Sequence, residues 1–595
     1  MKEVIETEVL VIGAGPAGAA ASVFLGQHGV RTVMVSRYSG TADTPRAHIT
    51  NQRAMEALRD AGLEEACMRR ASPSEHIQNT FWLRSMAGEE LARVYSWGND
   101  PRRLSDYATA SPCRMSDLPQ TELEPILVDG AIAHGVDMRF STELVSFEQD
   151  ETGVTAHLAD RTSGQTLEVR AKYMIGADGA RSGIVEQLGI PLEGQHGLGC
   201  AINVHCDIDL TPYVQHRHGS LFSTIQPGSS LWAPVAMFRM VKPWTQWLVA
   251  LMVPPTVDAP DPSVEEIETR LRELVGVPDI AIKILSVSKW WVNDVVAQYY
   301  SDGRIYCMGD AVHRHPPTNG LGSNTCVQDA FNLAWKLAYV LKGWAAPSLL
   351  DTYNEERQPV GRQIVARANQ SMGQNHQIWD LLGAGMVSAP ADGDHLEVFD
   401  TPQGRAALRA AVNQSHYEYH AHGVEMNRAY VSSAVVPDGS DLVYERDPEL
   451  FYQPSGRPGA CLPHVWLGQR HPSPKLSTLD VAGKQRFTLL IGPGGEAWRK
   501  AAAQVAQRTG VYIEVAGIGP FLDYEDLYGR WGETAGVDEG GCVLVRPDLY
   551  IAWRSASMQD DPTTALHGVM NTLLGLGPTH EHTPAAKVAQ ETAAV

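Results

Sequence analysis

A glycine-rich turn near the start of the chain is the feature that most constrains its fold. Residues 8–12 read EVLVI and are apolar after the first residue, the motif GAGPAG occupies residues 13–18, and a segment rich in small residues then ends at Gly29. A second apolar run, VRTVMVS, follows directly. Strand, tight turn, helix and strand in this order predict a βαβ unit of the Rossmann type.

The glycine spacing in this turn suits a dinucleotide. In such a motif the first glycine makes the turn, the second lets the backbone approach a pyrophosphate, and the helix N-terminus favours the negative charge. With 54 glycines in the chain the spacing alone proves little, but its place between a strand and a helix supports this interpretation. The residues expected to bind the dinucleotide are Gly13, Gly15, Pro16, Ala17 and Gly18.

The end of the second strand leaves the identity of the dinucleotide open. A Rossmann domain usually carries an acidic residue there to hold the ribose hydroxyls, whereas this chain has Ser36 followed by Arg37. Arg37 also suits the 2′-phosphate of NADP, so a simple NADP-dependent dehydrogenase is one hypothesis. We treat both residues as candidate cofactor contacts.

Composition and charge exclude several classes of protein. A chain of 595 residues with 44% hydrophobic and 20% charged residues is typical of a folded protein of several domains. Its net charge of -21 would repel phosphate backbones and anionic lipids, so we expect neither nucleic acid nor a membrane as a partner. The 8 cysteines are scattered without a C-x-x-C pair, and the first residues lack a signal-peptide pattern, which together predict a cytoplasmic protein.

Two distant segments narrow the class of cofactor. Residues 176–182 read GADGARS, and residues 309–313 read GDAVH ahead of a Pro- and Gly-rich loop at 316–322. Together with the first motif they resemble the single-component flavin-dependent aromatic hydroxylases, the family of p-hydroxybenzoate hydroxylase and phenol hydroxylase. The resemblance implies that FAD is the bound dinucleotide and that NADPH is a co-substrate that docks transiently.

The resemblance also implies the remaining cofactor contacts. Asp178 would lie near the pyrophosphate and the entry for NADPH, and the carboxylate of Asp310 would accept from hydroxyls of the flavin ribityl chain. Backbone N–H groups of the loop would face the electron-rich pyrimidine edge of the flavin. The residues expected along this loop are Pro317, Gly320, Leu321, Gly322 and Asn324.

Two further segments relate the chain to the phenol-hydroxylating members of the family. Residues 44–53 and 116–124 are similar to those of chlorophenol and hydroxybiphenyl monooxygenases, and the similarity extends from residue 6 to about residue 370. Arg46 and Gln120 match positions that contact the flavin in these relatives. The resemblance therefore adds both residues to the candidate cofactor site.

His48 is the candidate catalytic base. By resemblance it matches the active-site histidine of the hydroxybiphenyl enzymes and the aspartate base of phenol hydroxylase. A phenol, with a pKa near ~10, is a poor carbon nucleophile at neutral pH until a base such as an imidazole, with an ordinary pKa of ~6.5, takes its proton. Asp117 and Arg239 match two further pocket residues, and they suit orienting the imidazole and stabilising a phenolate.

The implied reaction is NAD(P)H- and O2-dependent hydroxylation of a phenolic ring ortho to its hydroxyl, through an FAD C4a-hydroperoxide, with a catechol-type product. We expect a phenolic or hydroxypyridine small molecule and O2 as substrates, and a homo-oligomer as the assembly. A tailoring hydroxylase of a larger natural product, such as a hydroxypyridine or polyketide, is the alternative. We expect no metal, because His313 and His315 lack Cys or carboxylate partners at short spacing.

The implied fold class is α/β. It combines a Rossmann-type FAD-binding domain like that of p-hydroxybenzoate hydroxylase with an interleaved β-sheet substrate domain and a C-terminal thioredoxin-like domain. That last domain has only Cys461 and Cys542, so it carries no C-x-x-C pair for redox chemistry. The predicted boundaries are 1–190 and 301–395 for the FAD-binding domain, 191–300 for the substrate-binding sheet, 396–424 for a linker, 425–585 for the thioredoxin-like domain and 586–595 for a disordered tail.

Overall fold

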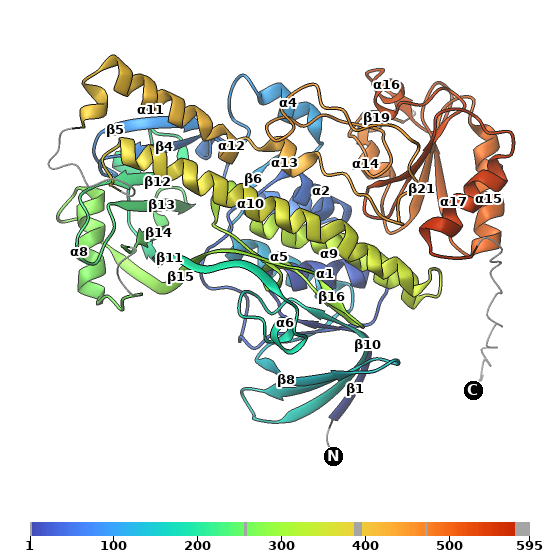
Figure 1. Ribbon diagram of the computed structural model, residues 1–595, viewed down its shortest axis with the longest axis horizontal. Coiled ribbons are helices and arrows are strands. Elements are labelled where there is room, and N and C mark those ends of the chain that lie inside the picture. Colours follow the sequence, from blue (N-terminus) through green and yellow to red (C-terminus); the bar gives the residue numbers. More distant parts are fainter. Residues whose placement is uncertain (1–2, 255–258, 386–395, 470–472, 578–595) are drawn as a thin grey trace. The chain divides into compact units, whose positions relative to one another are not determined.

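The structure is a computed structural model that describes residues 3–254, 259–385, 396–469 and 473–577 (Figure 1). Contacts divide the chain into two compact units. Unit 1 comprises residues 1–334, 353–428 and 443–453, and unit 2 comprises residues 335–352, 429–442 and 454–595. The predicted tail at 586–595 lies outside the described residues, and the predicted domain boundaries stay predictions.

The first sheet of unit 1 is the Rossmann-type layer. Its strands follow the order β16-β17-β10-β1-β2-β7, and β8 and β9 extend it beside β10. β1 pairs in parallel with both β2 and β10, and helix α1 connects β1 to β2, which confirms the predicted βαβ unit. The strands are β1 (Glu3–Ile12), β2 (Thr32–Val35), β7 (Asp137–Arg139), β8 (Thr142–Gln149), β9 (Val154–Asp160), β10 (Thr166–Gly176), β16 (Ser301–Asp302) and β17 (Ile305–Cys307).

The second sheet of unit 1 draws strands from three parts of the chain. Its order is β18-β15-β11-β14-β13-β12-β4-β5. Residues 191–300 supply five of these strands. β4 and β5 come from residues 79–95, and β18 comes after β17, the last strand of the first sheet along the chain. The strands are β4 (Asn79–Leu83), β5 (Glu90–Tyr95), β11 (Leu192–Asp207), β12 (Gly219–Ile225), β13 (Val235–Lys242), β14 (Gln246–Met252), β15 (Lys283–Ala297) and β18 (His313–Arg314).

The core of this second sheet is rich in aromatic side chains. Phe222, Phe238 and Trp247 are fully buried in it together with residues of helix α8 (Val264–Val275). α8 begins where Ser263 and Glu266 form a reciprocal capping box, which satisfies two N–H groups at the start of the helix.

The other helices of the first part of the chain surround these two sheets in Figure 1. They are α1 (Pro16–Gln27), α2 (Gln52–Asp60), α3 (Glu64–Arg70), α4 (Leu104–Ala110), α5 (Gln120–Ala133), α6 (Gly183–Gln187), α7 (Thr211–Val214), α9 (Gly322–Leu341), α10 (Asp351–Leu381), α11 (Pro402–Gln414), α12 (His416–Tyr419) and α13 (His422–Met426). α10 has 31 residues, and the predicted linker at 396–424 includes α11, α12 and the start of α13. None of the described helices combines the length and apolar character needed to cross a bilayer.

Unit 2 has the predicted thioredoxin-like arrangement. In its four-stranded sheet, β22-β21-β24-β25, the first pair is parallel and the others are antiparallel. Trp498 of helix α15 and Leu566 of helix α17 are buried in the core of this unit. Its elements are β19 (Trp466–Gly468), β20 (Leu476–Ser477), α14 (Thr478–Val481), β21 (Phe487–Ile491), α15 (Glu496–Thr509), β22 (Ile513–Gly517), β23 (Glu525–Asp526), α16 (Trp531–Ala535), β24 (Cys542–Val545), β25 (Ile551–Ser555) and α17 (Pro562–Leu573).

Candidate active site

The three sequence motifs meet at the start of α1. Gly13 has a φ of 110°, and a Cβ at this position would lie 2.1 Å from the carbonyl oxygen of Ala177, in the second motif. A Cβ on Gly309, in the third motif, would lie 3.0 Å from the Cβ of Ala17. Segments that are far apart in the sequence therefore touch, and glycine is required at both contacts.

The turn leaves room for a pyrophosphate at Gly15. A Cβ on Gly18 would lie 1.9 Å from the carbonyl oxygen of Gly13, whereas a Cβ on Gly15 would meet nothing nearer than Glu124 Oε1 at 3.8 Å. Gly15 is also the N-cap of α1, Pro16 follows it, and no side chain caps this helix. The first-turn N–H groups can thus bind an anion, which fits the pyrophosphate of a dinucleotide.

Two carboxylates suit the hydroxyl groups of such a ligand. Asp178 accepts from the backbone N–H of Ile184 at 3.3 Å through Oδ2, while its buried Oδ1 lacks a hydrogen-bond partner among the described residues. A buried acceptor without a donor is costly, so this oxygen fits a ligand hydroxyl. Asp310 is exposed in the third motif and offers a second carboxylate.

The loop predicted to face the flavin packs against the segment that follows His48. Gly320 has a φ of 60°, and a Cβ there would lie 3.1 Å from the Cβ of Ile49. Asn324 holds this contact: its Nδ2 donates to the Ile49 carbonyl at 2.7 Å, and its Oδ1 accepts from the Asn51 N–H at 2.9 Å. Both ends of the Asn324 amide therefore bind the protein itself, so this residue positions the loop.

A two-residue ladder brings His48 beside Asp117. Strand β3 (Ile49–Thr50) pairs antiparallel with β6 (Ser116–Asp117), with Ile49 opposite Asp117. The N–H of Leu118 donates to the His48 carbonyl at 2.6 Å and extends the ladder. The two candidate catalytic segments, far apart in the chain, are thus fixed by backbone hydrogen bonds.

His48, Asp117 and Arg239 form one chain of polar contacts. Nδ1 of His48 lies 3.3 Å from Asp117 Oδ1, and Nη2 of Arg239 donates to Asp117 Oδ2 at 2.6 Å. Arg239, on β13, also donates to the hydroxyl of Ser220 at 2.9 Å. The side chains of His48 and Asp117 are 6% and 0% exposed, so the contacts lie in a region of low dielectric where they are strong.

Electrostatics keep the imidazole neutral and the carboxyl ionised. Burial lowers the pKa of His48, Arg239 lowers it further, and Asp117 opposes both. Burial by itself raises the pKa of Asp117, but Arg239 and His48 together outweigh it, so the net shift is downward. At neutral pH the site thus holds an unprotonated imidazole beside an ion pair, as a base requires.

Comparison with known proteins identifies the family. Residues 6–368 match the family described as FAD binding domain, and residues 455–576 match the family described as aromatic-ring hydroxylase, C-terminal. The first match covers more than half of the 595 residues. The chain belongs to the FAD-dependent aromatic-ring hydroxylases. FAD is therefore the cofactor of this hydroxylase, which sets aside the simple NADP-dependent dehydrogenase.

Relatives of this hydroxylase match almost its whole length. It is 48% identical to a 2,4-dichlorophenol 6-monooxygenase of Delftia acidovorans, over 96% of this chain and 99% of the relative. It is 43% identical to a phenol 2-monooxygenase of Pseudomonas sp. (strain EST1001), over 96% and 93%. The crystal structure of the flavin-dependent monooxygenase PieE in complex with FAD and substrate matches with a TM-score of 0.89 and 43% identity, over 96% and 98%. The predicted family and fold class are confirmed.

The remaining predicted cofactor residues lie around the same turn of the hydroxylase. Ser36 is buried, and its hydroxyl accepts from the N–H of Tyr38 at 3.3 Å. Gln120 donates to Glu124 at 2.5 Å. The backbone carbonyl of Arg46 accepts from the N–H of Gln120 at 2.8 Å, and these two residues stay predicted flavin contacts.

Arg37 lies at a basic hollow beside the end of β2. The hollow encloses about 360 Å³. It is lined by Arg37, Tyr38, Glu143, Arg161 and Arg181. Three guanidinium groups against one carboxylate make its local charge opposite to that of the whole chain, which suits a phosphate-bearing ligand.

Sequence reasoning did not single out two residues of the hydroxylase site. Ser220 binds Arg239, but a lone serine on a strand gives no sequence signal. Glu124 faces Gly15, and its position four residues after Gln120 on α5 does carry a signal, because such residues share a helix face. Burial raises the pKa of Glu124, whose carboxylate accepts from Gln120 and from the N–H of Ala42.

The histidine pair of the third motif has protein partners. Nε2 of His313 lies 2.9 Å from Asp329 Oδ2, and Nδ1 of His315 lies 2.6 Å from the Pro316 carbonyl. Asp329, on α9, also accepts from Arg357 at 2.7 Å and from the Gly309 N–H at 3.2 Å. His313 therefore belongs to a buried network that holds the third motif.

Proposed function

We propose that this hydroxylase uses NAD(P)H and O2 to hydroxylate a phenolic ring ortho to its hydroxyl. One phenol, O2, NADPH and a proton would give a catechol, NADP+ and water. The observation that carries the proposal is the buried contact chain of His48, Asp117 and Arg239. Its similarity to relatives named for phenols supports the same substrate class.

Bound FAD supplies the activation of O2 and the transfer of one oxygen atom. The role of the chain's own residues is to prepare the ring that receives it. His48 accepts the phenolic proton, because a phenolate is far more electron-rich at its ortho carbon than a phenol. Asp117 orients the imidazole and balances the charge that forms on it, as a carboxylate does beside a catalytic histidine.

The resting hydrogen bond of His48 indicates that its tautomer changes when substrate binds. Nε2 of His48 lies 3.1 Å from the Pro45 carbonyl, to which it can only donate, while Nδ1 lies 3.3 Å from Asp117 Oδ1 without a hydrogen bond. When a phenol O–H replaces the Pro45 carbonyl, the imidazole hydrogen moves to Nδ1, beside Asp117, and the lone pair of Nε2 accepts the phenolic proton.

Arg239 has a second role in this proposal. It keeps Asp117 ionised, and its positive charge lies within the site where a phenolate would form. A buried guanidinium stabilises such an anion without the reorganisation that water would need. Base and cation therefore act on the same atom, the phenolic oxygen.

A panel of aromatic substrates tests the proposal. We would measure NADPH oxidation by the purified holoenzyme with halophenols, alkylphenols, hydroxybiphenyls and hydroxypyridines, and identify the products by mass and regiochemistry. The proposal expects substrate-stimulated oxidation coupled to an ortho-hydroxylated product. Oxidation without product on every small phenol, together with hydroxylation of a larger polyketide or hydroxypyridine, would instead support the tailoring hydroxylase.

The cellular setting and assembly are further proposals. We infer a cytoplasmic enzyme, because all 8 cysteines are free and buried, as suits a reducing compartment. We also propose a homo-oligomer, which light scattering coupled to size exclusion would test. A mass near 64.9 kDa would contradict this last proposal.

A further inference from the structure

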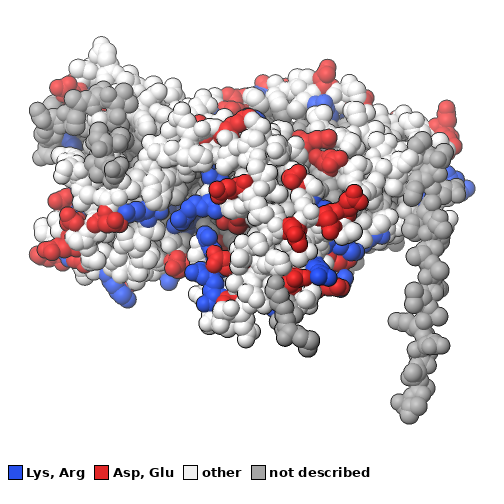
Figure 2. Space-filling view, turned by 60° about the horizontal axis from the view of Figure 1, so that its bottom comes forward, with Lys and Arg blue, Asp and Glu red and all other residues white. Residues whose placement is uncertain are grey.

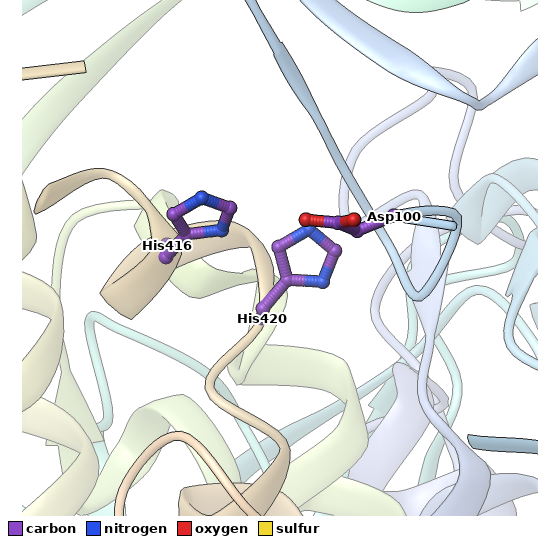
Figure 3. Close-up of side chains that lie close together, drawn as sticks. All are labelled: Asp100, His416 and His420. Carbon is purple, nitrogen blue, oxygen red and sulfur yellow. The ribbon is translucent and has the colours of Figure 1, made fainter. Parts of the chain in front are cut away.

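A group of three metal-binding side chains lies in unit 1, apart from the His48 contact chain. Asp100 follows β5, His416 begins α12, and His420 comes directly after that helix. One ligand atom from each lies within 4.8 Å of the others. Figure 3 shows the two imidazoles on neighbouring turns of the same segment, with the Asp100 carboxylate beside the His420 ring.

His420 is oriented as metal-binding histidines are. Its Nε2 lies 2.9 Å from the carbonyl oxygen of Tyr95, which fixes the hydrogen on that nitrogen. Nδ1 is then left with a lone pair, and this buried atom has no hydrogen-bond partner among the described residues. A backbone carbonyl that holds one nitrogen and turns the other toward an ion is the usual outer support of a metal-bound imidazole.

We propose that Asp100, His416 and His420 form a binding site for a divalent transition metal ion of the Zn²⁺ class. Two nitrogens and one oxygen match the three protein ligands of an open zinc site, whereas Mg²⁺ and Ca²⁺ prefer oxygen ligands alone. Around a tetrahedral ion at ~2.1 Å the ligand atoms lie about 3.4 Å apart, so ligand atoms that lie within 4.8 Å of one another would approach by at most about 1.4 Å. His416, the one ligand of the three that is only partly buried, would make most of this movement.

Arg102 competes with the metal for Asp100. Its Nε donates to Asp100 Oδ1 at 3.0 Å and its Nη2 donates to Oδ2 at 2.7 Å. The backbone N–H of Arg102 also donates to Oδ1, at 2.9 Å. The Arg102 side chain is 77% exposed, so the ion pair is weak enough for a metal to displace it. Removal of this guanidinium should therefore tighten metal binding.

The site would brace a helix that holds the flavin loop. The carbonyl oxygens of Tyr417 and Glu418, both on α12, accept from Nδ2 of Asn319 at 2.6 and 3.2 Å. Asn319 lies in the loop at 316–322 and has a φ of 64°. An ion that joins both ends of α12 to Asp100 would hold these carbonyls in place. The site stands independently of the proposed substrate.

Zinc titration of the untagged holoenzyme tests the proposal. After dialysis against a chelator, we would titrate Zn²⁺ against a competing indicator dye, and titrate Co²⁺ while recording its visible spectrum. We expect saturation at one ion per chain, with Co²⁺ bands typical of mixed nitrogen and oxygen ligands. His416→Ala should weaken Zn²⁺ binding by at least about tenfold, because a ligand is lost.

Two further variants distinguish a specific metal site from non-specific binding of Zn²⁺ by histidines. Arg102→Gln should tighten Zn²⁺ binding by roughly two- to fivefold, the effect of removing an exposed ion pair. His376→Ala is the matched control, since His376 is half-buried near Asp380 and belongs to no metal-binding group among the described residues, and it should change nothing. Equal Zn²⁺ affinity in the wild type and in His416→Ala, with unchanged melting temperatures, would overturn the proposal. Weaker binding in Arg102→Gln would do the same.

Discussion

The imidazole of His48 faces two acceptors at once. Pro45 offers a carbonyl oxygen to Nε2 and Asp117 offers a carboxylate to Nδ1, but a neutral imidazole carries a single N–H. Ala47, directly before it, has a φ of 47°, a conformation that residues with a side chain rarely adopt. The surroundings therefore hold the His48 ring where only one of these two contacts can be a hydrogen bond at a time.

Removal of this base should uncouple the enzyme. His48→Ala is expected to retain FAD and to oxidise NADPH, but to release hydrogen peroxide in place of hydroxylated product. General bases contribute about 10²- to 10⁴-fold, so product formation near neutral pH should fall by that factor. NADPH, peroxide and product would be measured in parallel. His157→Ala, in β9 away from the site, is the control, and normal hydroxylation by His48→Ala would show that the base is wrongly assigned.

The two partners of His48 should move its titration in opposite directions. Asp117 raises the pKa of His48 and Arg239 lowers it. The reaction measured by kcat/KM requires the neutral imidazole. The acid limb of the pH profile of kcat/KM therefore follows the pKa of His48. Asp117→Asn should shift the limb to lower pH, and Arg239→Gln should shift it to higher pH. Profiles of kcat/KM for one phenol, recorded with both variants, check this. Shifts in the same direction would contradict the contact chain.

At the scale of elements, two glycines of the turn between β1 and α1 should have different roles. Gly13 should matter for the stability of the fold, and Gly15 should matter for FAD binding. Gly13→Ala should destabilise the protein by about 1–3 kcal/mol, because it combines a positive φ with a Cβ 2.1 Å from Ala177. Gly15→Ala should leave the melting temperature unchanged, since nothing lies within 3.8 Å, yet weaken FAD binding by about tenfold, or 1.4 kcal/mol. Thermal unfolding and FAD titration of the apoprotein would distinguish the two. Unchanged FAD affinity in Gly15→Ala would place the pyrophosphate elsewhere.

The α9 carboxylate Asp329 should couple stability to cofactor retention. Burial alone raises its pKa, but Arg357 and His313 outweigh burial, so the net shift is downward. Asp329→Asn removes the buried partner of Arg357 and should cost about 3–5 kcal/mol while speeding FAD loss. Because the pKa is lowered by folding, this contribution is full above the ordinary carboxyl pKa and is lost as the pH falls through the folded value. Differential scanning calorimetry at neutral and acid pH, with the exposed Asp129→Asn as control, would measure it.

Long elements could be predicted from the sequence, but the small ladder at the site could not. The glycine motif between β1 and α1 is a local signal, and both elements formed as expected. β3 and β6 are two residues each, too short for any periodicity, and only their pairing places His48 beside Asp117. Those residues were therefore found by resemblance, whereas the geometry that links them required the structure.

At the scale of the whole molecule, unit 1 builds its site from two sheets. His48 directly precedes β3 and Asp117 lies in β6, while Arg239 lies in β13 of the second sheet. That sheet includes β4, whose Phe81 lies opposite Phe222 of β12 across a parallel pairing. Sequence patterns report neighbours along the chain, so they predicted the sheet but not its recruitment of residues 79–95.

Charge poses the last question at this scale. The chain carries -21, yet NADPH and phenolate are anions, so local positive charge must act against the total. Figure 2 shows basic side chains gathered in groups between acidic ones on one face. The hollow described above is lined by Arg37, Arg161 and Arg181 and so concentrates positive charge at one place. If these arginines govern the encounter, NADPH experiences attraction in spite of the net charge.

The dependence of KM for NADPH on salt concentration shows whether NADPH is attracted by the arginines or repelled by the net charge. Between about 20 and about 300 mM NaCl the screening length falls from roughly 20 Å to roughly 6 Å, so contacts with nearby arginines weaken. We expect KM for NADPH to rise severalfold with salt at unchanged kcat, and Arg181→Gln to raise KM at low salt and flatten the dependence. A chain governed by its net charge would repel NADPH, and screening would then lower KM. A falling KM would thus exclude the arginine-lined hollow as the source of attraction, because screening cannot make an attractive contact stronger.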